Sequence, residues 1–120
     1  MSWRKLSDIT EIEGSEGTKI RQIFHPHNTF NGIRYSVAHF SLEEGKRSHL
    51  HKMKTSEVYY FLEGEGMLYV DEDRYHVSKD SVAYIPPMSK QFIENTGKSK
   101  LKFLCIVDPA WKRENEILLD

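Results

Sequence analysis

Short segments of alternating apolar and polar residues, each ended by a turn, are the feature that most constrains the fold of this chain. Runs rich in β-branched and aromatic residues are separated by clusters of Gly, Pro, Asn, Asp and Ser, and the turns recur about every 8 to 12 residues. We expect strands over residues 19–24, 33–42, 67–70, 74–77, 82–85, 91–95 and 101–107. So many short strands predict an all-β protein, a small antiparallel β-barrel or sandwich that can enclose side chains or one small ligand.

The two ends of the chain differ from this pattern. Residues 1–18 are polar and rich in turn-forming residues, so we expect an N-terminal arm or edge strand ahead of a single barrel domain at residues 19–120. Residues 111–119 place Glu, Lys and Leu at helical spacing, which predicts a short C-terminal helix.

Size and charge narrow the classes of function. The chain has 120 residues, enough for one domain with a real core, and its formal net charge of −1 gives no support to a phosphate-backbone binder. No segment approaches the roughly 20 apolar residues that a transmembrane helix needs, and the N-terminus has no apolar run typical of a signal peptide. The single cysteine, Cys105, cannot form an internal disulfide. We therefore expect a cytoplasmic protein that binds neither nucleic acid nor membranes.

Residues 45–66 read GKRSHLHKMKTSEVYYFLEGEG and contain the strongest candidate site. Side chains alternate between the faces of a strand, so His49 and His51 share a face if this segment is extended. A turn after them could bring Glu57 opposite the two imidazoles. Two histidines and one carboxylate are the ligands of many zinc and non-haem iron(II) sites. The alternative is a solvated, histidine-rich edge among the neighbouring lysine and arginine side chains.

Two motifs in this chain are similar to those of a known superfamily. The first reads Gly45, His49-Leu-His51, Glu57 and Gly64, and the second reads Ile85-Pro86-Pro87, Gln91 and Asn95. From about Lys19 to the C-terminus the chain resembles the cupins, and within them the small single-domain, RmlC-like proteins labelled mannose-6-phosphate-isomerase-like. The resemblance implies a double-stranded β-helix, which is a jelly-roll-like barrel. Cupins of this size are commonly dimers, so it also implies a homodimer, for which residues 3–12 offer an exchangeable strand.

The resemblance further implies a divalent metal ion (zinc, iron, nickel or manganese) inside the barrel, held by His49, His51, Glu57 and Gln91. The spacing departs from the cupin pattern. Three residues separate Gly45 from His49, where five are common, and five separate His51 from Glu57, where three or four are usual. Gln91 stands where metal-binding cupins have a third histidine, and an amide oxygen is a weaker ligand than imidazole. The remaining set suits iron(II) oxygen chemistry or a Lewis-acid metal.

Three further residues are candidates for contacts with a substrate. Tyr59 shares the strand face of Glu57, and we consider it as a catalytic acid or as a partner of a substrate hydroxyl. Phe61 follows on the same face, and Arg34 could attract an anionic group. For Tyr59 the alternative is an aromatic side chain that fills the barrel, and for Arg34 it is a solvated basic edge. Cys105 lies in an apolar strand, so we expect it in the core.

Two hypotheses of function follow. The first is a small metal-dependent cupin enzyme that acts on a carbohydrate or another small polar metabolite, with isomerase-like or dioxygenase-like chemistry. The second is a non-enzymatic cupin that binds or senses a small molecule. In it a metal ion, if present, only holds the pocket together, and the replacement of the usual histidine by Gln91 leaves a metal-free site open. Both have a small molecule as the partner.

Overall fold

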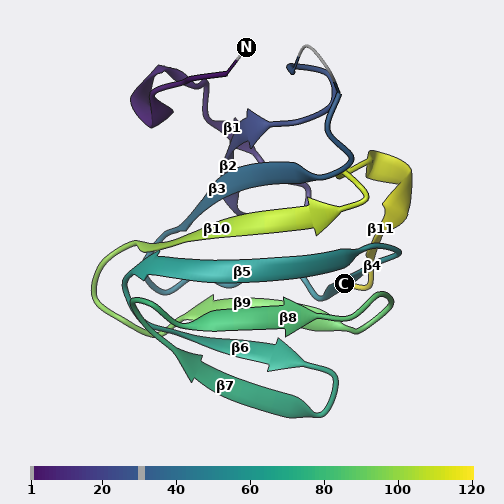
Figure 1. Ribbon diagram of the computed structural model, residues 1–120. Coiled ribbons are helices and arrows are strands. Elements are labelled where there is room, and N and C mark those ends of the chain that lie inside the picture. The colour runs from purple at the N-terminus through teal and green to yellow at the C-terminus, as the bar shows by residue number, and fades with distance from the viewer. Residues whose placement is uncertain (1, 30–31) are drawn as a thin grey trace.

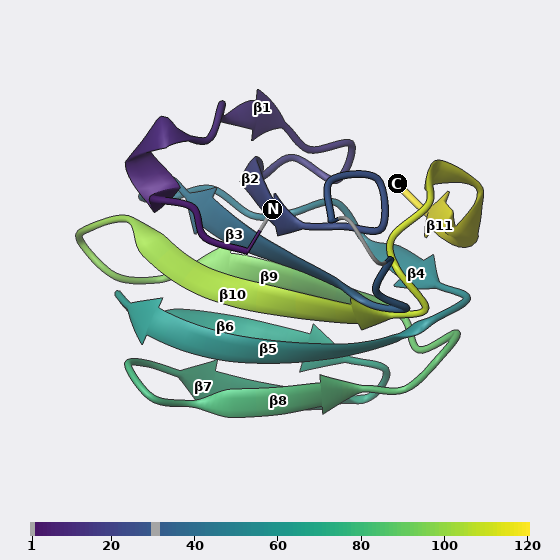
Figure 2. The same cartoon turned by 45° about the horizontal axis from the view of Figure 1, so that its top comes forward.

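The computed structural model describes residues 2–29 and 32–120 and consists of two antiparallel sheets (Figure 1). The first sheet has the order β1-β2-β3-β10-β5-β8, with β1 (Ile12–Glu13), β2 (Lys19–Phe24), β3 (Ser36–Leu42), β10 (Leu101–Asp108), β5 (Ser56–Glu63) and β8 (Val82–Ile85). The second has the order β11-β4-β9-β6-β7, with β11 (Glu116–Leu118), β4 (His51–Met53), β9 (Gln91–Asn95), β6 (Gly66–Val70) and β7 (Asp73–Val77). Figure 2 shows the layers, with β10, β5 and β8 in front of β9, β6 and β7. The predicted all-β barrel is confirmed.

Strand β10 shows how one barrel holds both a core and a pocket. It pairs with β3 on one side and with β5 on the other, and its buried residues alternate with less buried ones. At one end of β10, Leu101 and Phe103 are buried, and the Phe103 ring centre lies 5.1 Å from that of Phe61. At the other end, Val107 lines a cavity. The apolar core therefore closes one end of the barrel and leaves the other end for a site.

Most of the predicted strands are present. The strands expected at residues 19–24, 82–85 and 91–95 have the same bounds in the structure, and β3 begins at Ser36 rather than at residue 33. The N-terminal edge strand expected within residues 3–12 is the two-residue β1, at Ile12–Glu13, and no strand was predicted at the positions of β4 and β11. These strands have only two or three residues each, too few to show an alternating pattern, and they are defined by their pairing with other strands.

The prediction of a C-terminal helix at residues 111–119 is wrong. The segment forms one turn of 3-10 helix, η2 (Arg113–Asn115), and then β11, which pairs with β4 so that Leu118 lies opposite His51. A helix this short is marginal on its own, whereas pairing with β4 satisfies the backbone groups of both segments. This pairing brings the C-terminal segment to the open end of the barrel.

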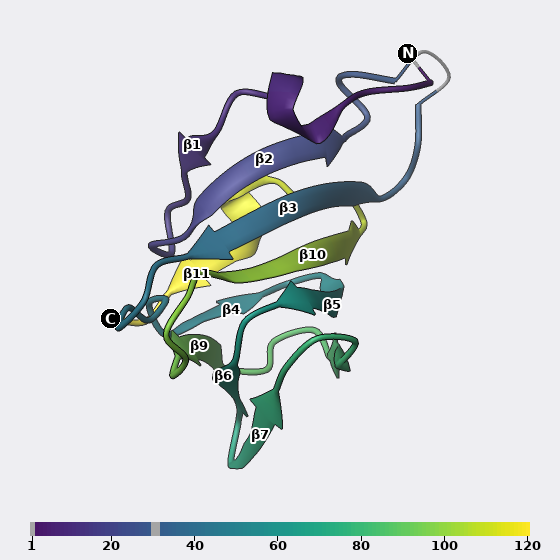
Figure 3. The same cartoon turned by 90° about the vertical axis from the view of Figure 1, so that its left-hand side faces the viewer.

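The N-terminal arm packs against its own chain, where its 3-10 turn η1 (Leu6–Asp8) lies along β2 (Figure 3). Arg4 Nη1 donates hydrogen bonds to the carbonyl oxygens of Gln22 and Ile23, at 3.1 and 2.9 Å, and Ile9 is buried. The arm thus completes the barrel of the same chain, and the homodimer stays a prediction. None of the helices in the described residues is long and apolar enough to cross a membrane.

Candidate functional site

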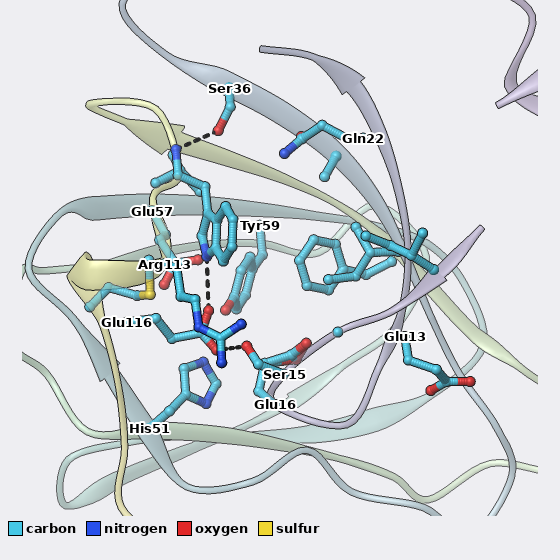
Figure 4. A pocket seen from close by; sticks show the side chains of 18 residues that line it. Glu13, Ser15, Glu16, Gln22, Ser36, His51, Glu57, Tyr59, Arg113 and Glu116 are labelled. Carbon is cyan, nitrogen blue, oxygen red and sulfur yellow. Dashed lines mark hydrogen bonds between the residues drawn. The ribbon is translucent and has the colours of Figure 1, made fainter. Parts of the chain in front are cut away.

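The open end of the barrel holds a cavity of about 480 Å³. Its wall is mostly apolar and includes Ile20, Phe40, Met53, Tyr59, Val107 and Trp111. The polar side chains around it include Glu16, His51, Glu57 and Glu116 (Figure 4). These four come from the N-terminal loop, β4, β5 and β11, so the site is assembled from segments that are far apart in the sequence.

Glu57 is held by buried donors behind the cavity wall. Gln91 Nε2 donates a hydrogen bond of 2.5 Å to Glu57 Oε1, and the Cys105 thiol donates one of 3.0 Å to Oε2. The Tyr59 hydroxyl donates a hydrogen bond of 2.5 Å to Gln91 Oε1. Burial raises the pKa of Glu57, although the two donors and the nearby His51 oppose that shift. The group therefore keeps a proton to higher pH than an exposed glutamate.

His51 presents one free ring nitrogen to the cavity. Its side chain is only 5% exposed, and its Nδ1 lies 2.7 Å from the carbonyl oxygen of His49. A carbonyl only accepts hydrogen bonds, so Nδ1 carries the proton and, in the neutral ring, Nε2 is an acceptor. Within the part of the chain that the structure describes, Nε2 has no hydrogen-bond partner. A ligand in the cavity can supply the missing donor.

Glu16 lies at the cavity in a loop between two glycines. It is buried, its two carboxylate oxygens accept hydrogen bonds of 2.6 and 2.9 Å from the Thr18 hydroxyl, and its carbonyl oxygen accepts the His49 amide. Burial raises its pKa, against the opposing effects of Thr18 and His51, and the charge of Glu116 raises it further. Glu16 was not among the predicted site residues, because its local sequence, a polar pair between two glycines, indicates a turn and gives no sign of a binding role.

Glu116 is the carboxyl group that the C-terminal strand β11 contributes to the site. Its Oε1 accepts a 2.6 Å hydrogen bond from the Ser15 hydroxyl, and its Oε2 accepts a 2.8 Å bond from the Trp111 indole. These contacts join the two ends of the chain across the mouth of the barrel. Sequence analysis missed them as well, because a helical reading of residues 111–119 gives no reason to place Trp111 and Glu116 beside the N-terminal loop.

The structure separates the two histidines that were expected to act together. His49 precedes β4, is exposed, does not line the cavity, and has its Nδ1 3.4 Å from Asp120 Oδ1. Strand β4 begins at His51, so alternation puts Met53 and not His49 on the face of His51. In this frame five residues lie between Gly45 and the first site residue, His51, and three lie between Met53 and Glu57. These are the spacings common in cupins.

The side chains at this position do not fit a divalent metal ion. Gln91 uses its amide oxygen to accept from Tyr59 and its amide nitrogen to donate to Glu57, so it offers no free donor atom. Both oxygens of Glu57 are already bonded, and the thioether of Met53 is a poor ligand for hard divalent ions. Across residues 2–29 and 32–120, no three His, Cys, Asp or Glu side chains are grouped so that they could hold a metal.

The other candidate residues have structural contacts. Tyr59 lines the cavity, but its hydroxyl is committed to Gln91, and burial holds its pKa well above the usual range. Phe61 is in the core and does not line the cavity. The side chain of Arg34 is 81% exposed and forms a two-pronged ion pair with Asp108, at 2.9 and 3.0 Å. Phe61 and Arg34 therefore lie away from the cavity, whereas Tyr59 is part of its wall.

The chain is similar to several known proteins. A family model described as the cupin domain matches residues 38–107. An uncharacterized protein of Methanocaldococcus jannaschii, MJ1618, is 38% identical over 88% of this chain and 84% of its own length. Among solved structures, a predicted oxalate decarboxylase of Thermotoga maritima has a TM-score of 0.75 at 24% identity, over 96% of this chain and 97% of its own. The oxalate decarboxylase of Bacillus subtilis has a TM-score of 0.80 at 25% identity, over 95% of this chain and 30% of its own.

These likenesses agree with the architecture described above. The family model spans strands β3 to β10, which include both sheets of the barrel, and the archaeal relative matches most of the chain. By its fold, its motifs and these matches, the chain belongs to the cupin domain family.

Proposed function

We propose that this protein binds a small organic molecule in its barrel without a resident metal ion, as a binding or sensing cupin. The observation that supports this most directly is the bridge formed by Gln91. Its amide joins Tyr59 to Glu57, so the position where a metal-binding cupin has a third histidine is occupied by a closed hydrogen-bond chain. A metal ion there would have to break both bonds of a buried side chain, and each buried group left unpaired costs about 1–3 kcal/mol.

The cavity has the properties of a small-molecule site. Its volume of about 480 Å³ lies within the usual range for ligand pockets, and a mostly apolar wall with a few polar groups is typical of them. His51 Nε2 faces it without a partner. Oxalate, the substrate of the enzymes to which two of the solved structures belong by name, does not suit this cavity, because four glutamate side chains line it and their ionised forms would repel a dianion.

Elemental analysis tests the proposal. Protein purified without an affinity tag and without added metal is analysed for transition metals, while native mass spectrometry looks for a bound small molecule. We expect metal far below one ion per chain, and an unfolding midpoint that does not change when a strong chelator is added. Near-stoichiometric metal, lost together with stability in the chelator, would refute the proposal and support the metal-dependent enzyme hypothesis.

Two histidine variants sharpen the test. His51→Ala removes a cavity side chain and His49→Ala removes an exposed one, and both delete one imidazole. We expect His51→Ala alone to weaken retention of the bound small molecule. Equal loss of metal in both variants would instead support a metal site that uses both histidines.

A further inference from the structure

We propose that the ligand of this cavity is an organic amine, whose ammonium group lies among Glu16, Glu57 and Glu116 and whose apolar or aromatic body lies against Trp111 and Tyr59. This inference rests on the proposed metal-independent binding and names the class of ligand.

The charge around the cavity favours a cation. Four glutamate side chains line it, Glu13 of β1, Glu16 of the loop after it, Glu57 of β5 and Glu116 of β11, and only one guanidinium, that of the exposed Arg113, is among the residues that line it. Both Glu16 and Glu57 are buried, and burial raises the pKa of each, although their hydrogen-bond donors and His51 oppose that shift. An ammonium group would favour the ionised carboxylates.

Unpaired acceptors in the cavity also call for a ligand that donates hydrogen bonds. The side chain of His51 is only 5% exposed, and its Nε2 acceptor has no hydrogen-bond partner among the described residues. Gln22 also lines the cavity, and its buried Oε1 has no hydrogen-bond partner in that same part of the chain. An ammonium group has three N–H donors and no acceptor, so it matches acceptors and carboxylates alike. An anionic ligand with no N–H or O–H group, such as a simple carboxylate, would leave both acceptors unpaired.

The remaining wall suits an apolar body attached to the amine. Aromatic rings of Phe40, Tyr59 and Trp111 and aliphatic groups of Ile20 and Val107 line the cavity. Aromatic faces attract a cation within about 6 Å of the ring centre and also pack against apolar carbon.

The test compares ligands that share a body and differ in charge. Phenethylamine, 2-phenylethanol and phenylacetate form one such set, and hexylamine, hexanol and hexanoate form a second. Trp3 is exposed and does not line the cavity, so Trp3→Phe leaves Trp111 as the only tryptophan and as a fluorescent reporter of the site. Titrations at pH 8 keep the amines protonated and exposed carboxylates ionised.

We expect at least one amine to bind about tenfold or more tightly than its matched alcohol, and the carboxylates not to bind measurably. Glu16→Gln should remove most of this preference, and the matched control Glu114→Gln, in the exposed η2 turn, should leave it intact. Thermal unfolding checks that each variant is folded.

Equal or tighter binding of the carboxylates, no binding of any amine, or an amine preference that survives Glu16→Gln would each overturn the inference. The proposed function fails by a different result, namely stoichiometric metal in the purified protein. The two proposals can therefore be rejected separately.

Discussion

The hydrogen-bond chain through Gln91 gives the sharpest quantitative prediction. Gln91 is 1% exposed, and its amide is the partner of two buried groups, the Tyr59 hydroxyl and the Glu57 carboxyl. Gln91→Leu has a similar volume but leaves both groups without that partner, although Glu57 keeps its bond from Cys105. Each unpaired buried group costs about 1–3 kcal/mol, and burial of the added apolar surface offsets part of the sum. We expect a net loss of about 2–4 kcal/mol in the free energy of unfolding.

A double-mutant cycle separates this chain from general packing. Tyr59→Phe removes only the hydroxyl and should cost about 1–2 kcal/mol, because Gln91 Oε1 loses its donor. Once the hydroxyl is gone, Gln91→Leu has one fewer group to leave unpaired, so the two changes should be non-additive by about 1 kcal/mol or more. Urea unfolding, followed by circular dichroism with and without a chelator, measures all four proteins. A cost below about 0.5 kcal/mol for Gln91→Leu, or strict additivity, would refute the reasoning.

Three further predictions follow from the same structure. Burial raises the folded-state pKa of Glu57 above its ordinary value of 4.5, so the stability that the protonated group contributes is present below that pH and is lost as pH rises through the folded-state pKa. Glu57→Gln should flatten this decline, measured by urea unfolding at a series of pH values from 4.5 upward. Met53→His combined with Gln91→His places two imidazoles beside His51. Calorimetry should then show Ni²⁺ or Zn²⁺ binding strengthened by about 100-fold or more. No such gain is expected if His49 and not Met53 faced the cavity. The predicted homodimer should form through the open edge of β8, where Val82 is 65% exposed; light scattering should give about twice 14.1 kDa, and Val82→Lys should give the monomer mass.

The barrel was predictable from the sequence because its strands carry their own evidence. In β9 and β10 buried and less buried residues alternate over five and eight residues, and turn residues mark both ends. That local pattern can be recognised in the sequence without knowing which strands pair with it. It also gave the inward direction of Glu57 and Tyr59, since both lie on one face of a long strand.

The site was less predictable, because the choice of residues that face the cavity depends on where the three-residue strand β4 begins. Histidines at positions 49 and 51 satisfy the same H-x-H pattern whichever residue enters the barrel first. Pairing of His51 with Gln91 in β9 and with Leu118 in β11 sets that choice, and both partners are at least forty residues away in the sequence. The unusual spacing from Gly45 was the one local signal, because a shift of two residues restores the common cupin spacing on both sides.

Under the proposed metal-independent binding, the two chain ends would make the site specific. The loop that contains Glu16 is tied to the segment before β4 by the hydrogen bond from the His49 amide, and to the C-terminal segment by the bond from Ser15 to Glu116. Glu116 in turn accepts from Trp111. In a cupin with a metal ion, the ion can organise its own ligands, whereas here these contacts fix the carboxyl groups in advance. Preorganised groups lose less conformational entropy when a ligand binds, so the ordered ends supply the rigidity that a metal would otherwise provide.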